Sequence, residues 1–346
     1  MLVVAGLSLK NLRPRVWDPA SQFYLPKLRA IMVSYADFYQ LPSMRRAAMK
    51  VGIREWLSVP DSVQVYLDNG AFYFLGRKGP DHFGGYEEFV ASTGANWWPI
   101  PQDYIPTPHM DARAQRACFR KTMDVNRSYQ ADGFVPVVHV GRQLKNYLSA
   151  VTECDALVAK ERIAIGGIVP NLLRAPKAIP YSDIIAGLKS ARAAFRTQDV
   201  HIFGVGGTST LHLAGVLGFN SADSAGWRNR AARGIIQLPG SGDRVVAELG
   251  SWRGRRPSED EWLRLKHCPC PACDGFGVAK LVATGIEGFE RRAAHNLFVL
   301  LEEAEWIDKE LAAGTYAKNY EDRLDNSIYL RHVKTALEIN GEATRI

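Results

Sequence analysis

The stretch Val63-Gln-Val-Tyr-Leu-Asp-Asn-Gly70 is a short β-branched, aromatic and aliphatic run that ends in an aspartate and a turn-forming glycine. Such runs are typical of strands. The sequence predicts eight strands of this kind: Leu2–Ala5, Ile31–Tyr35, Val63–Leu67, Asn96–Ile100, Val135–His139, Arg162–Ile165, His201–Gly204 and Asn220–Asp223. Helical periodicity marks the segments between most of them: Ser43–Trp56, Ala112–Gln130, Leu144–Lys160, Ser182–Arg196 and Ser209–Leu217. Strand alternating with helix predicts an α/β fold, a closed (β/α)8 TIM barrel over residues 1–224.

An open doubly wound sheet is the rival fold, and it requires a glycine-rich phosphate loop after the first strand. Gly6-Leu-Ser-Leu-Lys10 does not supply that loop. After the eighth strand the alternation stops. We expect residues 225–315 to form a loop-rich, basic, zinc-binding elaboration packed on the barrel, with one long helix over Ile286–Ala313. Residues 316–346 are expected to form a C-terminal helix and tail.

Three thiols lie close together in Cys268-Pro-Cys270-Pro-Ala-Cys273, and His295 follows within the predicted long helix. Four soft donors are what a closed tetrahedral Zn²⁺ site requires, and four protein ligands make such a site structural. A disulfide is the alternative, but a bridge between the first two thiols would be strained and five cysteines is an odd number. Cys118 and Cys154 stand alone in apolar-periodic segments and are interpreted as core thiols.

The chain has 346 residues and a formal net charge of +7, and much of the excess lies between residues 226 and 266. That segment holds nine basic residues against five acidic ones, with Trp227, Trp252 and Trp262 among them. Basic residues with aromatics suit contact with nucleic-acid phosphates and bases, although a solvated charged face is the alternative. No apolar run is long enough for a membrane span or a signal segment, so we expect a cytoplasmic protein without a membrane partner.

Polar residues recur at the carboxyl ends of the predicted strands, where TIM barrels place their chemistry. Three of them are aspartates and one is a histidine: Asp68, Asp103, Asp223 and His139. Gly166-Gly167 and Gly206-Gly207 also end strands and would let a planar ligand approach the backbone. Taken singly, each aspartate could be a turn former, His139 a core histidine and Gly206-Gly207 a turn. Their coincidence at one end of the barrel favours a catalytic site.

The order of these motifs resembles the tRNA-guanine transglycosylase superfamily. The resemblance runs from Asp68-Asn-Gly-Ala-Phe72 through the Asp223 neighbourhood to Cys-x-Cys-x-x-Cys and His295. It implies that Asp223 attacks the anomeric carbon of a guanosine and that Asp68 is the general acid/base. It places Asp103, His139, Gly166, Gly167, Gly206 and Phe72 around the base, and Arg228, Arg230 and Arg233 at the nucleic-acid backbone.

Several positions depart from the family pattern. Asn69-Gly-Ala-Phe-Tyr73 stands where the family has Ser-Gly-Gly-Phe-Gln, and His139-Val-Gly141 stands where it has Gln-Gly. Arg233-Gly234 replaces Arg-Asn-Gly, and no archaeal-type RNA-binding domain is expected. These departures resemble the DpdA-type branch, whose enzymes insert 7-cyano-7-deazaguanine into DNA. The leading hypothesis is therefore replacement of guanine in DNA by a 7-deazaguanine base.

Three alternatives stay open at the level of sequence. The chain could act on tRNA, it could be a noncatalytic zinc-containing nucleic-acid-binding subunit, or it could be a hydrolase with Asp68, His139 and Asp223 as metal ligands. The resemblance also implies a homodimer. Helper proteins that open DNA, the sequence context and the identity of the 7-deazapurine are left undetermined.

Overall fold

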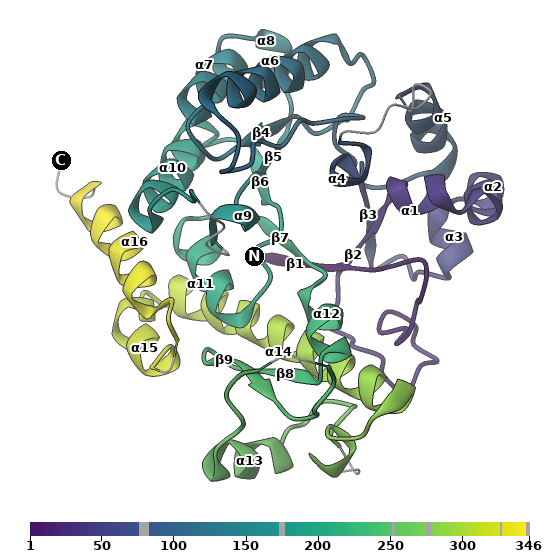
Figure 1. Ribbon diagram of the computed structural model, residues 1–346, viewed down its shortest axis with the longest axis vertical. Helices are drawn as coiled ribbons and strands as arrows, with labels where there is room; N and C mark the ends of the chain where they lie inside the picture. The colour runs from purple at the N-terminus through teal and green to yellow at the C-terminus, as the bar shows by residue number, and fades with distance from the viewer. Residues whose placement is uncertain (76–82, 173–176, 251–252, 275–277, 326, 344–346) are drawn as a thin grey trace.

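The computed structural model describes residues 1–75, 83–172, 177–250, 253–274, 278–325 and 327–343. Seven strands form one curled sheet in the order β3-β2-β1-β7-β6-β5-β4, and every neighbouring pair is parallel. The strands are β1 Leu2–Gly6, β2 Ala30–Ser34, β3 Gln64–Asp68, β4 Val137–His139, β5 Arg162–Gly166, β6 Asp199–Ile202 and β7 Ser221–Ser224. Figure 1 shows them around a centre, with helices outside. The predicted α/β fold with a parallel sheet is confirmed.

The predicted fourth strand, Asn96–Ile100, is not a regular strand in the structure. Instead, isolated parallel bridges join Tyr66 to Trp97 and Pro99 to Val135. The Leu67 amide donates to the Trp97 carbonyl at 2.8 Å, and the Val135 amide donates to the Trp98 carbonyl at 2.9 Å. Pro99 has no N–H to give to a ladder, which limits regular pairing here. The segment therefore lies between β3 and β4, the two edges of the sheet.

Helices follow most strands, as the alternation predicted. Those of the sheet region are α1 Tyr35–Gln40, α2 Pro42–Val51, α3 Ile53–Leu57, α4 Ala71–Phe74, α5 Phe83–Thr93, α6 Ala112–Ser128, α7 Leu144–Thr152, α8 Asp155–Val158, α9 Val169–Leu172, α10 Tyr181–Ala194 and α11 Thr208–Val216. Two predicted helices are each divided into two. Ser43–Trp56 breaks at Gly52, whose φ of 88° lies outside the helical region, and Leu144–Lys160 breaks between α7 and α8.

The region after β7 is more regular than the predicted loop-rich elaboration. It contains α12 Gly226–Ala232, an antiparallel hairpin of β8 Ile235–Leu238 and β9 Gly242–Val245, α13 Glu259–Lys266 and the short η1 Val278–Lys280. The 28-residue helix α14, Gly285–Ala312, matches the predicted long helix. Two further helices, α15 Tyr316–Arg323 and α16 Leu330–Ala343, follow where one was predicted. Ser258 and Glu261 form a capping box that starts α13, and this Ser-x-x-Glu pattern is visible in the sequence.

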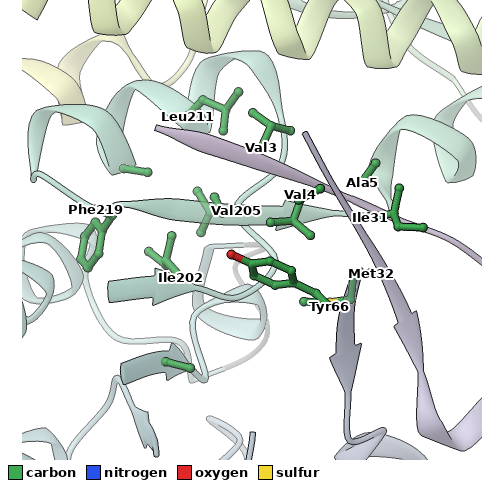
Figure 2. Close-up of a cluster of buried hydrophobic side chains, with 14 of the residues drawn as sticks. Val3, Val4, Ala5, Ile31, Met32, Tyr66, Ile202, Val205, Leu211 and Phe219 are labelled. Atoms are coloured by element: carbon green, nitrogen blue, oxygen red, sulfur yellow. The ribbon is translucent and has the colours of Figure 1, made fainter. Parts of the chain in front are cut away.

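The core joins the sheet to the surrounding helices. Figure 2 shows buried apolar side chains of β1, β2 and β6 beside Leu211 of α11 and Phe219 before β7. α14 packs against α11, α12, β1 and β8, so it links the parallel sheet with the hairpin. None of the described helices combines the length and apolar character needed to cross a membrane. This arrangement fixes the strand ends that carry the predicted site.

Candidate active site and metal centre

A cavity of about 490 Å³ lies at the carboxyl ends of the parallel strands. This volume is in the range of pockets that bind small organic ligands. Its lining includes most of the predicted site residues: Asp68, Phe72, Asp103, His139, Gly166, Gly167 and Asp223. Residues separated by up to 155 positions therefore meet at one mouth, as parallel strands ending at one rim require.

Asp68 is the last residue of β3 and is partly buried. Its Oδ2 accepts hydrogen bonds from Ser34 Oγ at 2.9 Å and from the Gly70 amide at 3.0 Å. Burial raises the pKa of Asp68 to about 7, and the carboxylates of Asp103 and Asp223 act in the same direction, against the Ser34 and Gly70 hydrogen bonds. A carboxyl group with this pKa can both donate and accept a proton near neutral pH.

Asp103 is buried and is held from two sides. Asn69 Nδ2 donates to Asp103 Oδ1 at 2.8 Å and also to the Ile100 carbonyl at 2.8 Å. His139 Nε2 lies 3.0 Å from Asp103 Oδ2, within ion-pair distance, although its ring orientation gives no aligned hydrogen bond. Asn69 thus ties the end of β3 to the bridged segment and fixes Asp103 in the cavity wall.

Asp223, in β7, is partly buried, and one of its oxygens has two neighbours. Oδ1 accepts a hydrogen bond from the Gly204 amide at 2.7 Å, and His201 Nε2 lies 3.4 Å from the same oxygen. Among the described residues, Oδ2 has no hydrogen-bond donor. One oxygen of this carboxylate is therefore anchored, and the other accepts no hydrogen bond from the part of the chain that the structure describes.

The predicted glycines divide into two groups. Gly166 and Gly167 line the cavity, and a Cβ on Gly166 would come within 2.9 Å of His139 Nδ1. Gly206 does not line it. A Cβ there would lie 1.9 Å from the Ser224 Cβ, so this glycine permits close packing of the β6 loop on β7. Phe72 stands at the rim with 66% of its surface exposed, which leaves its ring face available to a planar ligand.

The predicted backbone-binding arginines are not equally accessible. Arg228 is buried, donates to the Asn11 carbonyl and lies against the Trp227 ring, so it does not form an exposed phosphate contact. Arg230 pairs with Asp243 through Nε at 2.7 Å. Arg233 is exposed at the end of α12. Packing buries Arg228 and an ion pair occupies Arg230, and charge counting along the sequence could reveal neither.

The predicted tryptophans also fall into different environments. Trp227 is fully buried and donates from Nε1 to the Gly6 carbonyl at 3.2 Å, so it is unavailable for base stacking. Trp262 is partly buried against the core. Trp252 lies outside the described residues. Besides Arg233, the exposed basic residues among those described in this segment lie both in the loop before α13, at Arg253, Arg255 and Arg256, and on α13 itself, at Arg264 and Lys266.

The predicted metal ligands Cys268, Cys270, Cys273 and His295 form one cluster whose donor atoms all lie within 4.8 Å of one another. The three Sγ atoms are 3.7, 3.5 and 3.5 Å from His295 Nδ1. A tetrahedral Zn²⁺ with ordinary bond lengths would hold sulfur and nitrogen about 3.6 Å apart. The donor set and its spacing therefore fit a zinc ion. Cys118 is buried and Cys154 partly buried, both outside this cluster.

A contact on the far side of the His295 ring, away from the three thiols, fixes the orientation of this histidine. His295 Nε2 lies 3.1 Å from the Gln237 carbonyl of β8. An N–H that donates to a carbonyl leaves Nδ1 as the lone-pair nitrogen, the form that binds a metal. A metal here would connect the cysteine turn, α14 and the β8–β9 hairpin.

Three residues of the site have no role in the sequence-based prediction: Ser34, Asn69 and His201. Each lies at or beside a strand whose position was predicted. His201 and Phe203 are two positions apart in the predicted strand His201–Gly204, so the strand period of two places both side chains on one face. That signal could have indicated His201 as a neighbour of Asp223. No sequence signal reports the contacts of Ser34 and Asn69, because they depend on how adjacent strands pair.

The chain is similar to curated archaeal proteins, although the sequence matches no established protein-family model. It is 24% identical over 298 residues to the tRNA-guanine(15) transglycosylase of Thermococcus kodakarensis, and 27% identical over 296 residues to that of Pyrococcus abyssi. Both alignments cover 82% of this chain and 46% of the relative. The Methanocaldococcus jannaschii protein of the same name is 27% identical, with 83% and 42% covered. The chain thus spans a little under half the length of these relatives.

Proposed function

We propose that this chain is a member of the tRNA-guanine transglycosylase superfamily, whose archaeal proteins it matches at 24–27% identity, and that it is a pentosyltransferase that exchanges guanine in a nucleic acid for a 7-deazaguanine base. The observation that carries this proposal is the meeting of Asp68, Asp103 and Asp223 around one base-sized cavity. Asp223 is the proposed nucleophile, Asp68 the general acid/base, and Asp103 the group that binds the purine edge. His139, Phe72, Gly166 and Gly167 complete the proposed base pocket.

Two displacements make up the proposed reaction. In the first, an Asp223 oxygen bonds to the anomeric carbon as the bond from that carbon to guanine N9 breaks, and the electron pair leaves with the base. Asp68 then supplies a proton to the departing purine. In the second, Asp68 takes a proton from the incoming base, whose nitrogen displaces Asp223 from the sugar. This is the division of labour of retaining glycosidases.

The raised pKa of Asp68 supports its assignment as the proton carrier. Both protonation states are populated near neutral pH when the pKa is about 7, so one group can serve both displacements.

The proposal includes a closed (β/α)8 barrel. In it, Asn96–Ile100, the predicted fourth strand, would fill the gap between β3 and β4 and bring the number of strands to eight. The bridges of Trp97 to β3 and of Pro99 to Val135 support this closure. Residues 225–315 would then form the elaboration that carries a structural Zn²⁺ on Cys268, Cys270, Cys273 and His295, followed by the C-terminal part, 316–346. The zinc would supply folding energy and take no part in the base exchange.

DNA is the proposed nucleic acid, with 7-cyano-7-deazaguanine as one candidate base, and tRNA is the alternative. His139 stands where the superfamily has glutamine, and its ring lies against Gly166 in the wall of the cavity. This departure favours a base or substrate different from that of the tRNA enzymes. The names of the relatives favour tRNA. A flipped or single-stranded guanine is required in either case, because the cavity cannot receive a stacked base.

A label-exchange assay tests the proposal. The protein is incubated with labelled guanine, or with 7-cyano-7-deazaguanine, together with duplex DNA, single-stranded DNA or tRNA. Label in DNA supports the proposed reaction, and label in tRNA alone would show that the tRNA alternative is correct. No incorporation into any of these, with no covalent protein–nucleic acid adduct on a denaturing gel, would leave a noncatalytic binding subunit as the better description.

A further inference from the structure

His201 of β6 is buried beside the proposed nucleophile and is enclosed by aromatic rings. Its ring centroid lies 5.1 Å from that of Trp97, 4.9 Å from that of Phe203 and 5.9 Å from that of Tyr66. Only 2% of the residue's surface is exposed. An imidazole in such surroundings has few available partners, so each polar atom within its reach matters.

The two ring nitrogens have different neighbours. Nδ1 lies 2.8 Å from Ser221 Oγ, in hydrogen-bond geometry. Nε2 lies 3.4 Å from Asp223 Oδ1, and it has no aligned hydrogen bond within the described chain. When the Ser221 hydroxyl donates to Nδ1, the ring proton resides on Nε2, the nitrogen nearer to Asp223, and a small rotation of the ring would align this N–H with Oδ1.

The same carboxylate oxygen is already held by the Gly204 amide at 2.7 Å. A donor from His201 would give Oδ1 two hydrogen bonds and leave Oδ2 with none from the described protein. The electron pairs of Oδ2 then remain available for bond formation. A nucleophilic carboxylate gains from such an arrangement, because rotation about its Cβ–Cγ bond is suppressed before the sugar arrives.

We propose that His201 is a positioning residue for Asp223: its Nε2–H and the Gly204 amide anchor Oδ1, so that Oδ2 is the oxygen that bonds to the anomeric carbon. This inference rests on the proposed function and adds to it which oxygen reacts and what holds it. His201 exchanges no proton with the substrate. The bond made is Oδ2–C1′, the bond broken is C1′–N9, and the leaving purine takes its proton from Asp68.

A neutral core histidine packed only for its shape is the competing explanation, and substitutions distinguish the two. His201→Phe keeps an aromatic ring among Trp97, Phe203 and Tyr66 but removes the donor. We expect kcat to fall about 10- to 100-fold while KM for the base changes less than about twofold, since the base pocket is intact. His201→Gln restores an N–H near the Nε2 position and should recover kcat to within about fivefold of wild type.

The matched control is His109→Phe, because His109 is an exposed histidine that does not line the cavity. Its kcat should equal that of wild type. Melting temperature and zinc content of every variant show whether the fold is retained. The inference is overturned if a folded His201→Phe variant keeps wild-type kcat, or if His201→Gln is as slow as His201→Phe.

A second measurement does not depend on turnover. In protein labelled with ¹⁵N-histidine, the spectrum of His201 should show a protonated Nε2 and an unprotonated Nδ1, and the Nε2 signal should move in Asp223→Ala. A protonated Nδ1, or an Nε2 signal that ignores Asp223→Ala, would refute the contact. If wild type exchanges no base on any nucleic acid, the proposed function fails, whereas this spectrum still decides whether His201 bonds to Asp223.

Discussion

The cavity at the strand ends and the cysteine cluster are both gatherings of polar side chains, and their polar atoms are used differently. In the cluster, three Sγ atoms surround His295 Nδ1, and the other histidine nitrogen faces the Gln237 carbonyl. At the cavity, His139 in its wall and His201 beside Asp223 are buried but keep nitrogens without an aligned hydrogen bond within the described chain. The donor atoms of the cysteine cluster face one another, whereas the cavity keeps polar atoms that could bind a ligand.

This difference separates a stabilising site from a reactive one. Four protein donors around one metal ion leave no coordination position for a substrate. The free energy of metal binding at such a site stabilises the folded protein. Buried groups with unsatisfied atoms cost stability and are retained where a ligand completes them. Substitutions in the cavity should therefore change activity more than stability, and substitutions in the cluster should do the reverse.

The largest effect is expected for Asp223→Asn. The amide is a poor nucleophile, so we expect exchange to fall about 10⁴-fold and the covalent adduct to disappear. Melting temperature and zinc content should match wild type, because the Gly204 amide can still donate to the Asn oxygen. If this variant kept full exchange activity, Asp223 would not be the nucleophile, and the cavity would not be the reactive site of the comparison.

Asp68→Asn should lower kcat about 10²- to 10⁴-fold by removing the proton carrier. Its effect on stability has an unusual sign. The folded pKa is about 7 and the unfolded one about 3.9, so the folded protein binds the proton more tightly. Wild type therefore loses stability as the pH rises from about 4 to about 7, because the unfolded state releases the Asp68 proton first. The loss is absent below this range and complete above it.

The asparagine variant does not carry this penalty. Relative to wild type, its melting temperature should rise as the pH is raised from 4 to 7 and then level off. Thermal melts of both proteins across this range measure the difference. A constant difference at all pH values would show that the Asp68 carboxyl is not perturbed in the folded protein.

Cys273→Ser tests the other side of the comparison. Loss of one thiolate should abolish stoichiometric zinc and lower stability by about 3 kcal/mol or more, because metal binding and folding are coupled. Cys154→Ser is the control, since that thiol lies outside the cluster, and it should cost at most about 1 kcal/mol. Zinc analysis with denaturant unfolding measures both. Unchanged zinc content in Cys273→Ser would refute the four-ligand assignment.

The smallest effect is expected for Asp103→Asn. The isosteric change keeps the contact with Asn69 but removes the charge that faces the base, so KM for the base should rise about tenfold with kcat changed less than about threefold. The alkaline limb of the pH–rate profile should also move to lower pH, because Asp68 must be protonated for the first displacement and the Asp103 charge raises the pKa of Asp68. A fall in kcat alone would reassign Asp103 to the chemical step.

Much of the fold could be predicted because strands and helices leave local periodic signals. Seven of the eight predicted strands overlap observed ones, and the exception, Asn96–Ile100, contains a proline that limits regular pairing. The β8–β9 hairpin is not among the predicted strands, because Ile235–Leu238 lies within a basic segment that masks its strand signal, although Pro239-Gly-Ser-Gly242 is a turn signal between two short runs.

The site was predictable where it depends on strand ends and unpredictable where it depends on packing. Asp68, Asp103 and Asp223 each follow or end a strand, so their meeting followed from the parallel order. Arg228 lies in an exposed-looking basic run, yet its side chain is buried against Trp227. Sequence spacing gives the position of a residue along the chain but not which side chain a helix turns inward.

The packing of α14 determines whether the parallel sheet and the region after it could fold separately. Its apolar face meets α11 so closely that a Cβ on Gly215 would come within 2.5 Å of the Ile307 side chain, and the helix also contacts β1. A fragment ending at residue 224 would leave these surfaces open to water. We therefore expect sheet and hairpin to melt in a single calorimetric transition, and protease cuts near residue 224 to leave two pieces that remain associated.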